Sequence, residues 1–206
     1  MKPRYLSEAE TKRLKDALRN RDAEKRLKAE SGNRWRAERG KTLRPKLPEF
    51  FVDHLEVMVL VSLLSGLRQN ELFLLEWRDI EEDFSAINLR AETTKTKRSR
   101  SVPLGKTLKD VLVKWRKQTK GNSLVFSNNG EKIDNADKAW KKLLKDAEIA
   151  DFRWHDMRHD FASQLVIRDV SIEKVSKLLG HTNIKTTQRY AHLSDSSLRE
   201  AVETLG

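Results

Sequence analysis

The chain has 206 residues, of which 37% are hydrophobic and 35% charged, enough for one packed domain with an unusually ionic surface. Its 42 Lys and Arg exceed its 31 Asp and Glu, giving a net charge of +11 that favours a polyanionic partner such as nucleic acid. The absence of cysteine excludes disulfide scaffolds, thiol catalysis and Cys-ligated zinc, and no apolar run is long enough for a membrane span or a secretion signal. We therefore expect a cytoplasmic protein that binds nucleic acid and does not bind a membrane.

The sequence predicts a mostly helical chain. A capping box at Ser7 and Glu10 starts a charged helix that should reach about Leu27. The glycines and prolines that follow predict a basic loop over 31–48. Further segments of helical character are, in chain order, 50–65 (apolar almost all round and ended by Gly66), 69–77, 106–119, 136–147, 155–168, 172–179, 183–191 and 195–204.

Two segments, 84–90 and 98–104, are typical of β-strands, and 125–126 is a candidate third strand. The expected fold class is therefore α+β, mostly α, with a small antiparallel β-sheet. Positive charge is concentrated in two segments, since residues 1–49 have 16 basic and 8 acidic side chains and residues 94–120 have 10 basic and 1 acidic. An excess gathered in patches indicates a binding face.

Arg68 and Glu71 form the first candidate functional pair. Arg68 comes just after the helix-ending Gly66, at the start of the next helix, where the backbone can direct its side chain inward. Glu71 is three residues further on the same helix face, so its carboxylate can hold the guanidinium group in place.

A second group, His155, Arg158 and His159, shares one face of the predicted helix 155–168. An Arg beside a His suits a phosphate, because the Arg donates to two oxygens and the His donates or moves a proton. The two histidines could in principle bind zinc. The segment lacks the Glu of the metalloprotease motif and any Cys, so we expect no metal.

The last candidates are His181 and Tyr190. Gly180 fits a helix C-terminal cap, which places His181 on a turn, and Tyr190 follows nine residues later. A single His or Tyr is more often structural than catalytic, so the weight of these residues comes from their combination. The sequence has no phosphate-binding glycine loop, and nucleotide-dependent chemistry is not expected.

Taken in order, these segments resemble the catalytic domain of the tyrosine recombinases, the phage integrase family. The family pattern is Arg, Lys, His-x-x-Arg, Gly-His and then Tyr, and the resemblance covers about residues 5–204. The matching positions here are Arg68, Lys95, His155, Arg158, His181 and Tyr190. Lys97 lies so close to Lys95 that either lysine could be the family's hairpin lysine.

The resemblance implies site-specific recombination, with integration or excision of mobile DNA, and no cofactor. Tyr190 would attack a DNA phosphorus and form a 3′-phosphotyrosyl bond. The other positions imply roles around that phosphate: charge stabilisation by Arg68 and Arg158, hydrogen bonding by His181, proton transfer or orientation by His155, and protonation of the departing 5′-oxygen by Lys95. Supporting roles fall to Glu71 and His159, and contacts to the DNA backbone to Lys97, Arg98 and Arg100.

The resemblance also implies how the chain is organised. Residues 1–206 would form the catalytic domain, without the N-terminal core-binding domain of full-length members, and 28–49 would be a loop insertion. The segment 194–206 would form a helix that packs on its own domain or docks in trans on a neighbouring protomer. The expected partner is double-stranded DNA at attachment sites, bound by a homotetramer on paired sites, with a monomer for the isolated domain. The protein would be encoded by a bacterium or a phage and associated with the nucleoid.

Two other interpretations stay open. A type IB topoisomerase-like enzyme shares the nucleophile and the arginines but relaxes DNA as a monomer. A DNA-binding module that kept the fold would perform no chemistry, and it would have no need of all six matching residues.

Overall fold

The computed structural model describes residues 3–95, 97–119, 121–128 and 130–194, so the tail helix expected at 195–204 lies outside the described residues. The helices are α1 (Glu8–Ala37), α2 (His54–Ser65), α3 (Gln69–Phe73), α4 (Lys106–Gln118), α5 (Asp137–Asp146), α6 (Asp156–Ile167), α7 (Ile172–Leu179) and α8 (Lys185–Gln188). Short 3-10 helices lie at Trp77–Asp79, Ala91–Thr93 and Ala191–Leu193. The strands are β1 (Ala86–Leu89), β2 (Arg100–Pro103), β3 (Ser127–Asn128) and β4 (Glu131–Lys132). The described chain is thus mostly helical with small antiparallel strand pairs, which confirms the predicted fold class.

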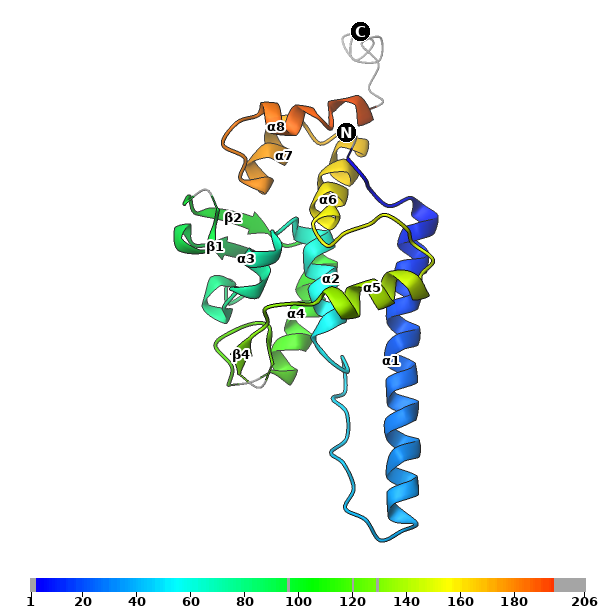
Figure 1. The fold of residues 1–206 in the computed structure, drawn as a ribbon. Helices are drawn as coiled ribbons and strands as arrows, with labels where there is room; N and C mark the ends of the chain where they lie inside the picture. Colours follow the sequence, from blue (N-terminus) through cyan, green and yellow to red (C-terminus); the bar gives the residue numbers. More distant parts are fainter. Residues whose placement is uncertain (1–2, 96, 120, 129, 195–206) are drawn as a thin grey trace.

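Helix α2 lies at the centre of the fold, as expected for a helix that is apolar almost all round. It packs against α6 on one side and α4 on another, and α1 packs against α5 (Figure 1). Several of its side chains, including Val57, Met58 and Val59, have no exposed surface. Such a helix is stable when neighbouring elements cover most of its surface, and here Leu64 near its end remains 40% exposed.

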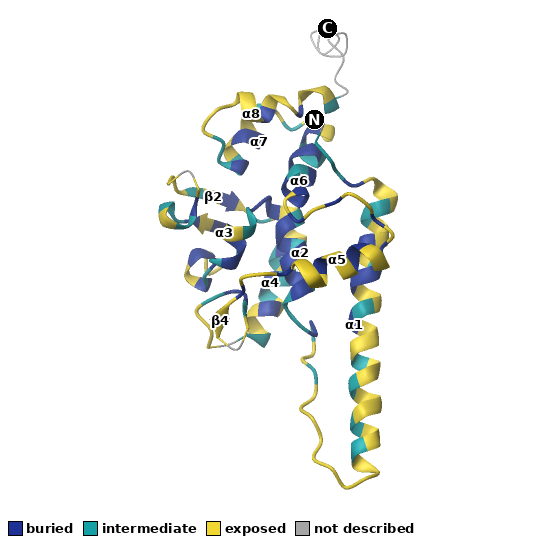
Figure 2. Ribbon diagram, viewed as in Figure 1, coloured by how far each residue is buried: buried dark blue, intermediate teal, exposed yellow. Residues whose placement is uncertain are grey.

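Helix α1 is longer than predicted. It continues well beyond Leu27, so the first part of the expected loop insertion 28–49 is helical. The Gly32 inside it costs a helix about 1 kcal/mol relative to alanine, which a long helix can absorb. The returning chain also supports the helix, because Asn33 exchanges two hydrogen bonds of 2.9 Å with the backbone of Arg44. This end of α1 and the returning chain form an exposed arm that projects from the body (Figures 1 and 2).

The small sheet confirms two of the three predicted strands. β1 pairs antiparallel with β2, with Ile87 opposite Val102. The third candidate, 125–126, is wrong: these residues are buried, but the strands β3 and β4 follow them and pair only with each other. Val125 instead donates one backbone hydrogen bond to Leu75, so it joins the core as an irregular segment.

The buried apolar residues form two clusters, and α6 contributes residues to both. The large cluster includes α2, the β1–β2 sheet, α4 and α5. The small one joins the second half of α6 to α7 and includes the side chain of Tyr190.

Within the described residues, none of the helices combines the length and the apolar character that a membrane crossing requires.

Candidate active site

Gly66 turns the chain so that Arg68 begins α3. Its φ of +64° is the left-handed region, and a Cβ there would lie 2.5 Å from a ring carbon of Phe161, so only glycine fits. Glu71 then accepts a 2.8 Å hydrogen bond from the backbone N–H of Arg68 and a 3.0 Å bond from its guanidinium. The predicted pairing of Arg68 with Glu71 is confirmed.

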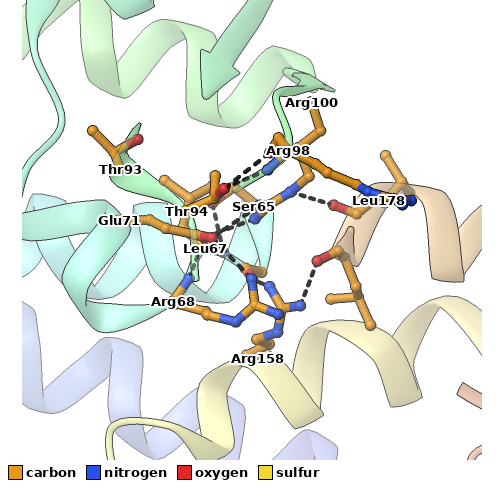
Figure 3. A network of polar contacts seen from close by, with 12 residues as sticks. Ser65, Leu67, Arg68, Glu71, Thr93, Thr94, Arg98, Arg100, Arg158 and Leu178 are labelled. Carbon is orange, nitrogen blue, oxygen red and sulfur yellow. Dashed lines mark hydrogen bonds and ion pairs between the residues drawn. The ribbon is translucent and has the colours of Figure 1, made fainter. Parts of the chain in front are cut away.

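Arg100 differs from Lys97 and Arg98, which were expected to contact DNA with it, in how far its side chain is exposed. Lys97 and Arg98 are exposed, but the Arg100 side chain is only 8% exposed and points into the protein, where its Nη1 and Nη2 donate to both carboxylate oxygens of Glu71 (Figure 3). Its Nε donates to the carbonyl of Leu178. In this arrangement Arg100 does not face the surface, so the expectation that it contacts DNA alongside its neighbours is not supported.

Glu71 therefore ionises in spite of its burial. Burial alone would raise the pKa of this carboxyl, but the hydrogen bonds and charge of Arg100 and the Arg68 backbone N–H outweigh it and hold the pKa below its usual range.

Arg158 is 4% exposed and lies beside Arg68 (Figure 3). Its Nη1 donates to the Gly66 carbonyl at 2.7 Å, and its Nη2 donates to the Leu179 carbonyl. Burial and the nearby Arg68 and Arg100 cations lower the pKa of Arg158 to about 9, so it stays charged at neutral pH. A guanidinium has five N–H donors, and the two carbonyls use two of them.

His155 and His159 lie on one face of α6, as predicted, with their ring centroids 5.1 Å apart in an edge-to-face arrangement. His159 Nδ1 lies 2.5 Å from the hydroxyl of Tyr190, whose residue is 1% exposed. Burial, His155 and Arg189 lower the pKa of His159 to about 4, so a neutral imidazole faces the phenol and can accept its proton. Burial raises the pKa of Tyr190 above its usual value.

His181 follows Gly180, which has a φ of +65° and caps α7 as predicted. The His181 Nδ1 lies 2.8 Å from the hydroxyl of the buried Thr187. Burial and the Arg158 and Arg68 cations lower the pKa of His181 to about 4, so this ring is also neutral at pH 7.

An open cavity of about 470 Å³ lies over Arg68. It is lined by Arg68, Gln69, Asn70, Glu71, Leu74, Glu92, Thr93, Thr94, Lys95 and His155. Lys95 is thus a lining residue, whereas Lys97, two residues further along the turn with a φ of +53°, is not. Tyr190 does not line this cavity either. A larger cavity of about 1050 Å³ between α1, α2 and α5 has a lining of mixed charge and includes none of the candidate residues.

Two contacts of the site were not anticipated from the sequence: the pairing of Arg100 with Glu71, and the contact of His159 with Tyr190. Both join residues that are far apart in the chain. The spacing of residues along a single helix, which predicted the other contacts, therefore cannot predict these two. As for the possible zinc pair His155 and His159, the described residues contain no group of three or more side chains that could hold a metal ion.

Comparisons with known proteins agree with this geometry. Residues 52–197 match the phage integrase family. The integrase of Salmonella phage P22 is 32% identical over 71% of this chain, and a tyrosine recombinase XerC-like protein of Caldanaerobacter subterraneus is 32% identical over 78% of it. The chain spans 41% and 51% of the lengths of these two relatives.

The crystal structure of XerA recombinase superposes on the whole chain with a TM-score of 0.65 and 26% identity, and the chain covers 66% of that protein. The match over residues 52–197, the two curated relatives and this shared fold together show that the chain belongs to the phage integrase family, with the catalytic-domain fold of the tyrosine recombinases.

Proposed function

We propose that this chain cuts and rejoins DNA strands in site-specific recombination of mobile DNA, through a covalent bond between Tyr190 and a 3′-phosphate. The observation that supports it most is the grouping of the family's positions: Arg68, Lys95 and His155 line one cavity, and Arg158 lies beside Arg68. No stretch of sequence holds these residues together, so the fold is what gathers them.

In the proposed step, the Tyr190 oxygen attacks phosphorus as the bond from phosphorus to the 5′-oxygen breaks. The departing 5′-oxygen takes a proton from the Lys95 ammonium, and the phenolic proton passes to a histidine. His159 already faces that hydroxyl, and His155 is next to it. The phosphotyrosyl ester keeps the energy of the broken bond, so a 5′-hydroxyl can reverse the step without ATP.

The transition state gathers negative charge on the non-bridging phosphate oxygens. The cations of Arg68 and Arg158 would stabilise that charge in a site partly shielded from water. A neutral His181 that accepts the Thr187 hydroxyl at Nδ1 carries its proton at Nε2, from which it can donate to a third oxygen position.

The nucleophile must be uncovered before it reacts. Tyr190 is 1% exposed, belongs to the small apolar cluster and bonds to His159, and it is not among the residues that line the cavity. The proposal therefore includes a shift of the segment around Tyr190 when DNA binds.

We extend the proposal to the partners. Exposed Lys97 and Arg98 would contact the backbone of duplex DNA next to the cut, and four copies would assemble on two paired attachment sites. Sedimentation of the protein with site-bearing DNA measures this assembly. Complexes that contain a single copy on every DNA that is cleaved would contradict the tetramer.

The test of the reaction uses nicked duplexes with a randomised central sequence, in which the nick traps the covalent intermediate. The wild-type protein should give a protein–DNA band on a denaturing gel, and sequencing of the trapped DNA should reveal a preferred site. Tyr190→Phe should give no such band but should still shift the DNA on a native gel.

A covalent band that persists in Tyr190→Phe, or no band from the wild-type protein, would overturn the proposal. Relaxation of supercoiled plasmids without any preferred cleavage position would point instead to the topoisomerase-like activity.

A further inference from the structure

Arg100 has contacts that set it apart from the basic residues around it. It follows a turn in which exposed Lys95, Lys97 and Arg98 face solvent, yet its own side chain is almost fully buried. A guanidinium group buried beside a single carboxylate and a backbone carbonyl is positioned in space by three directed hydrogen bonds.

The first of these contacts ties the β1–β2 sheet to α3. Glu71 Oε1 accepts from Arg68 and Arg100 at 3.0 and 2.9 Å, and Oε2 accepts from the Arg68 backbone and Arg100 at 2.8 and 2.7 Å. An ionised carboxylate has about four acceptor positions, so these bonds fill them. Glu71 thus sets the position of Arg100 relative to Arg68.

The second contact ties the sheet to the end of α7. Arg100 Nε donates to the carbonyl of Leu178 at 3.2 Å, and Arg158 donates to the carbonyl of the next residue, Leu179. The Arg100 side chain also fills the space beside Gly180, where a Cβ would lie 2.7 Å from Arg100 Cδ. The sheet therefore packs directly against the turn that leads to His181.

The third link runs from Arg100 back along the chain to Lys95. The buried Thr94 hydroxyl lies 2.9 Å from the Arg98 carbonyl and accepts from the Arg98 backbone N–H at 3.2 Å, which closes the turn around Lys95. Arg98 is two residues before Arg100. Thr94 directly precedes Lys95, so the anchor at Arg100 is linked through Arg98 and Thr94 to the lysine at the cavity (Figure 3 shows Thr94, Arg98 and Arg100).

From these contacts we propose that Arg100 is a positioning residue for strand cleavage, which holds the β1–β2 turn so that Lys95 stays at the cavity over Arg68. This inference rests on the proposed function, because it gives Arg100 its effect through the general acid Lys95. Arg68 keeps its own two bonds to Glu71 without Arg100, so the defect expected on losing Arg100 falls on protonation of the leaving group.

The test compares two nicked substrates, one with the natural 5′-oxygen at the cut and one with sulfur in its place. A thiolate is a far weaker base than an alkoxide, so it departs without a proton from Lys95. Single-turnover cleavage at saturating DNA is measured for Arg100→Met, Arg100→Lys, Lys95→Ala and, as the control, Ser99→Ala at the exposed residue next to Arg100.

Arg100→Met should cleave the oxygen substrate about 100-fold more slowly than the wild type, in the range that general acid catalysis contributes, and should cleave the sulfur substrate at close to the wild-type rate. Lys95→Ala should show the same pattern. Arg100→Lys keeps a positive charge next to Glu71, so this variant should remain folded. It should also cleave the oxygen substrate more slowly than the sulfur substrate, but with a smaller loss of rate than Arg100→Met. Ser99→Ala should cleave both substrates at the wild-type rate.

Equal losses on the two substrates in a folded Arg100→Lys protein would overturn the inference, and so would an unchanged rate on the oxygen substrate. Failure of the proposed function would appear differently, as no covalent band from the wild-type protein on either substrate.

Discussion

Acid should destabilise this protein between pH 7 and pH 5, and two histidines of the site should account for much of the effect. Burial and neighbouring cations lower the pKa of His159 and of His181 from 6.5 to about 4. His159 faces His155, Arg189 and Arg158, and His181 faces the three arginines of the site. Because the unfolded chain binds protons at a higher pH than the folded one, stability is lost as the pH falls below 6.5.

The loss of folding stability can be calculated from the folded and unfolded pKa values of each histidine. A group that titrates at 6.5 when unfolded and near 4 when folded loses roughly 2 kcal/mol of stability between pH 7 and pH 5. Both rings are partly exposed, so about 1 to 2 kcal/mol for each is the expected range. The most strongly perturbed carboxyls, Glu10 and Asp53, have a folded pKa of about 2, and their contribution is lost mainly below this window.

Urea unfolding at pH 7 and pH 5 measures the effect. The double variant His159→Gln, His181→Gln keeps hydrogen-bonding groups at both positions, and its stability should change less between the two pH values than the wild type's, by about 2 to 4 kcal/mol. Thr182→Ala, at an exposed neighbour of His181, should keep the wild-type change. A double variant with the full wild-type change would show that these rings are protonated as readily in the folded protein as in the unfolded chain.

Two further predictions follow from the geometry. Gly180→Ala should lose about 1 to 2 kcal/mol in urea unfolding, because its left-handed backbone and the nearby Arg100 side chain both oppose a Cβ. Gly105→Ala, where nothing lies within 4 Å of the added carbon, is the matched control, and equal losses at the two glycines would contradict the prediction. Replacing exposed Lys97 and Arg98 by Ala should reduce the slope of log K against log salt for DNA by about 1 for each phosphate contact removed, and an unchanged slope would place the DNA elsewhere.

Much of the site could be predicted because its signals are local. A glycine that ends a helix, followed by Arg68 and Glu71 at i and i+3, fixes a pair from the geometry of one turn. The same holds for His155, Arg158 and His159, which one helix must present together. The pairing of β1 with β2, which places Ile87 opposite Val102, agrees with the two strands predicted at 84–90 and 98–104.

The features that the sequence did not predict depend on contacts between segments far apart in the chain. The basic run before Val102 gives the same sequence pattern whether a residue faces solvent or a buried carboxylate, so nothing local separates Arg98 from Arg100. Helix α1 continues through Gly32, and next to it Asn33 bonds to the returning chain at Arg44, a contact that no local signal in the sequence shows. Residues 125–126 are as apolar as a strand, but they are held in the core by the backbone bond from Val125 to Leu75 and by contacts of both residues with Trp115.

Arg68 and Arg100 share the single carboxylate of Glu71, and this sharing also affects the net charge that the site presents to a ligand. With His159 and His181 neutral at pH 7, the three guanidinium groups of Arg68, Arg100 and Arg158 exceed the one carboxylate of Glu71 by two charges, and Lys95 adds a further basic group at the cavity. A phosphodiester in its ground state carries one negative charge, and its five-coordinate transition state carries nearly two. In the proposed reaction, a cationic site would therefore bind the transition state more tightly than resting DNA, and this difference in binding would lower the barrier.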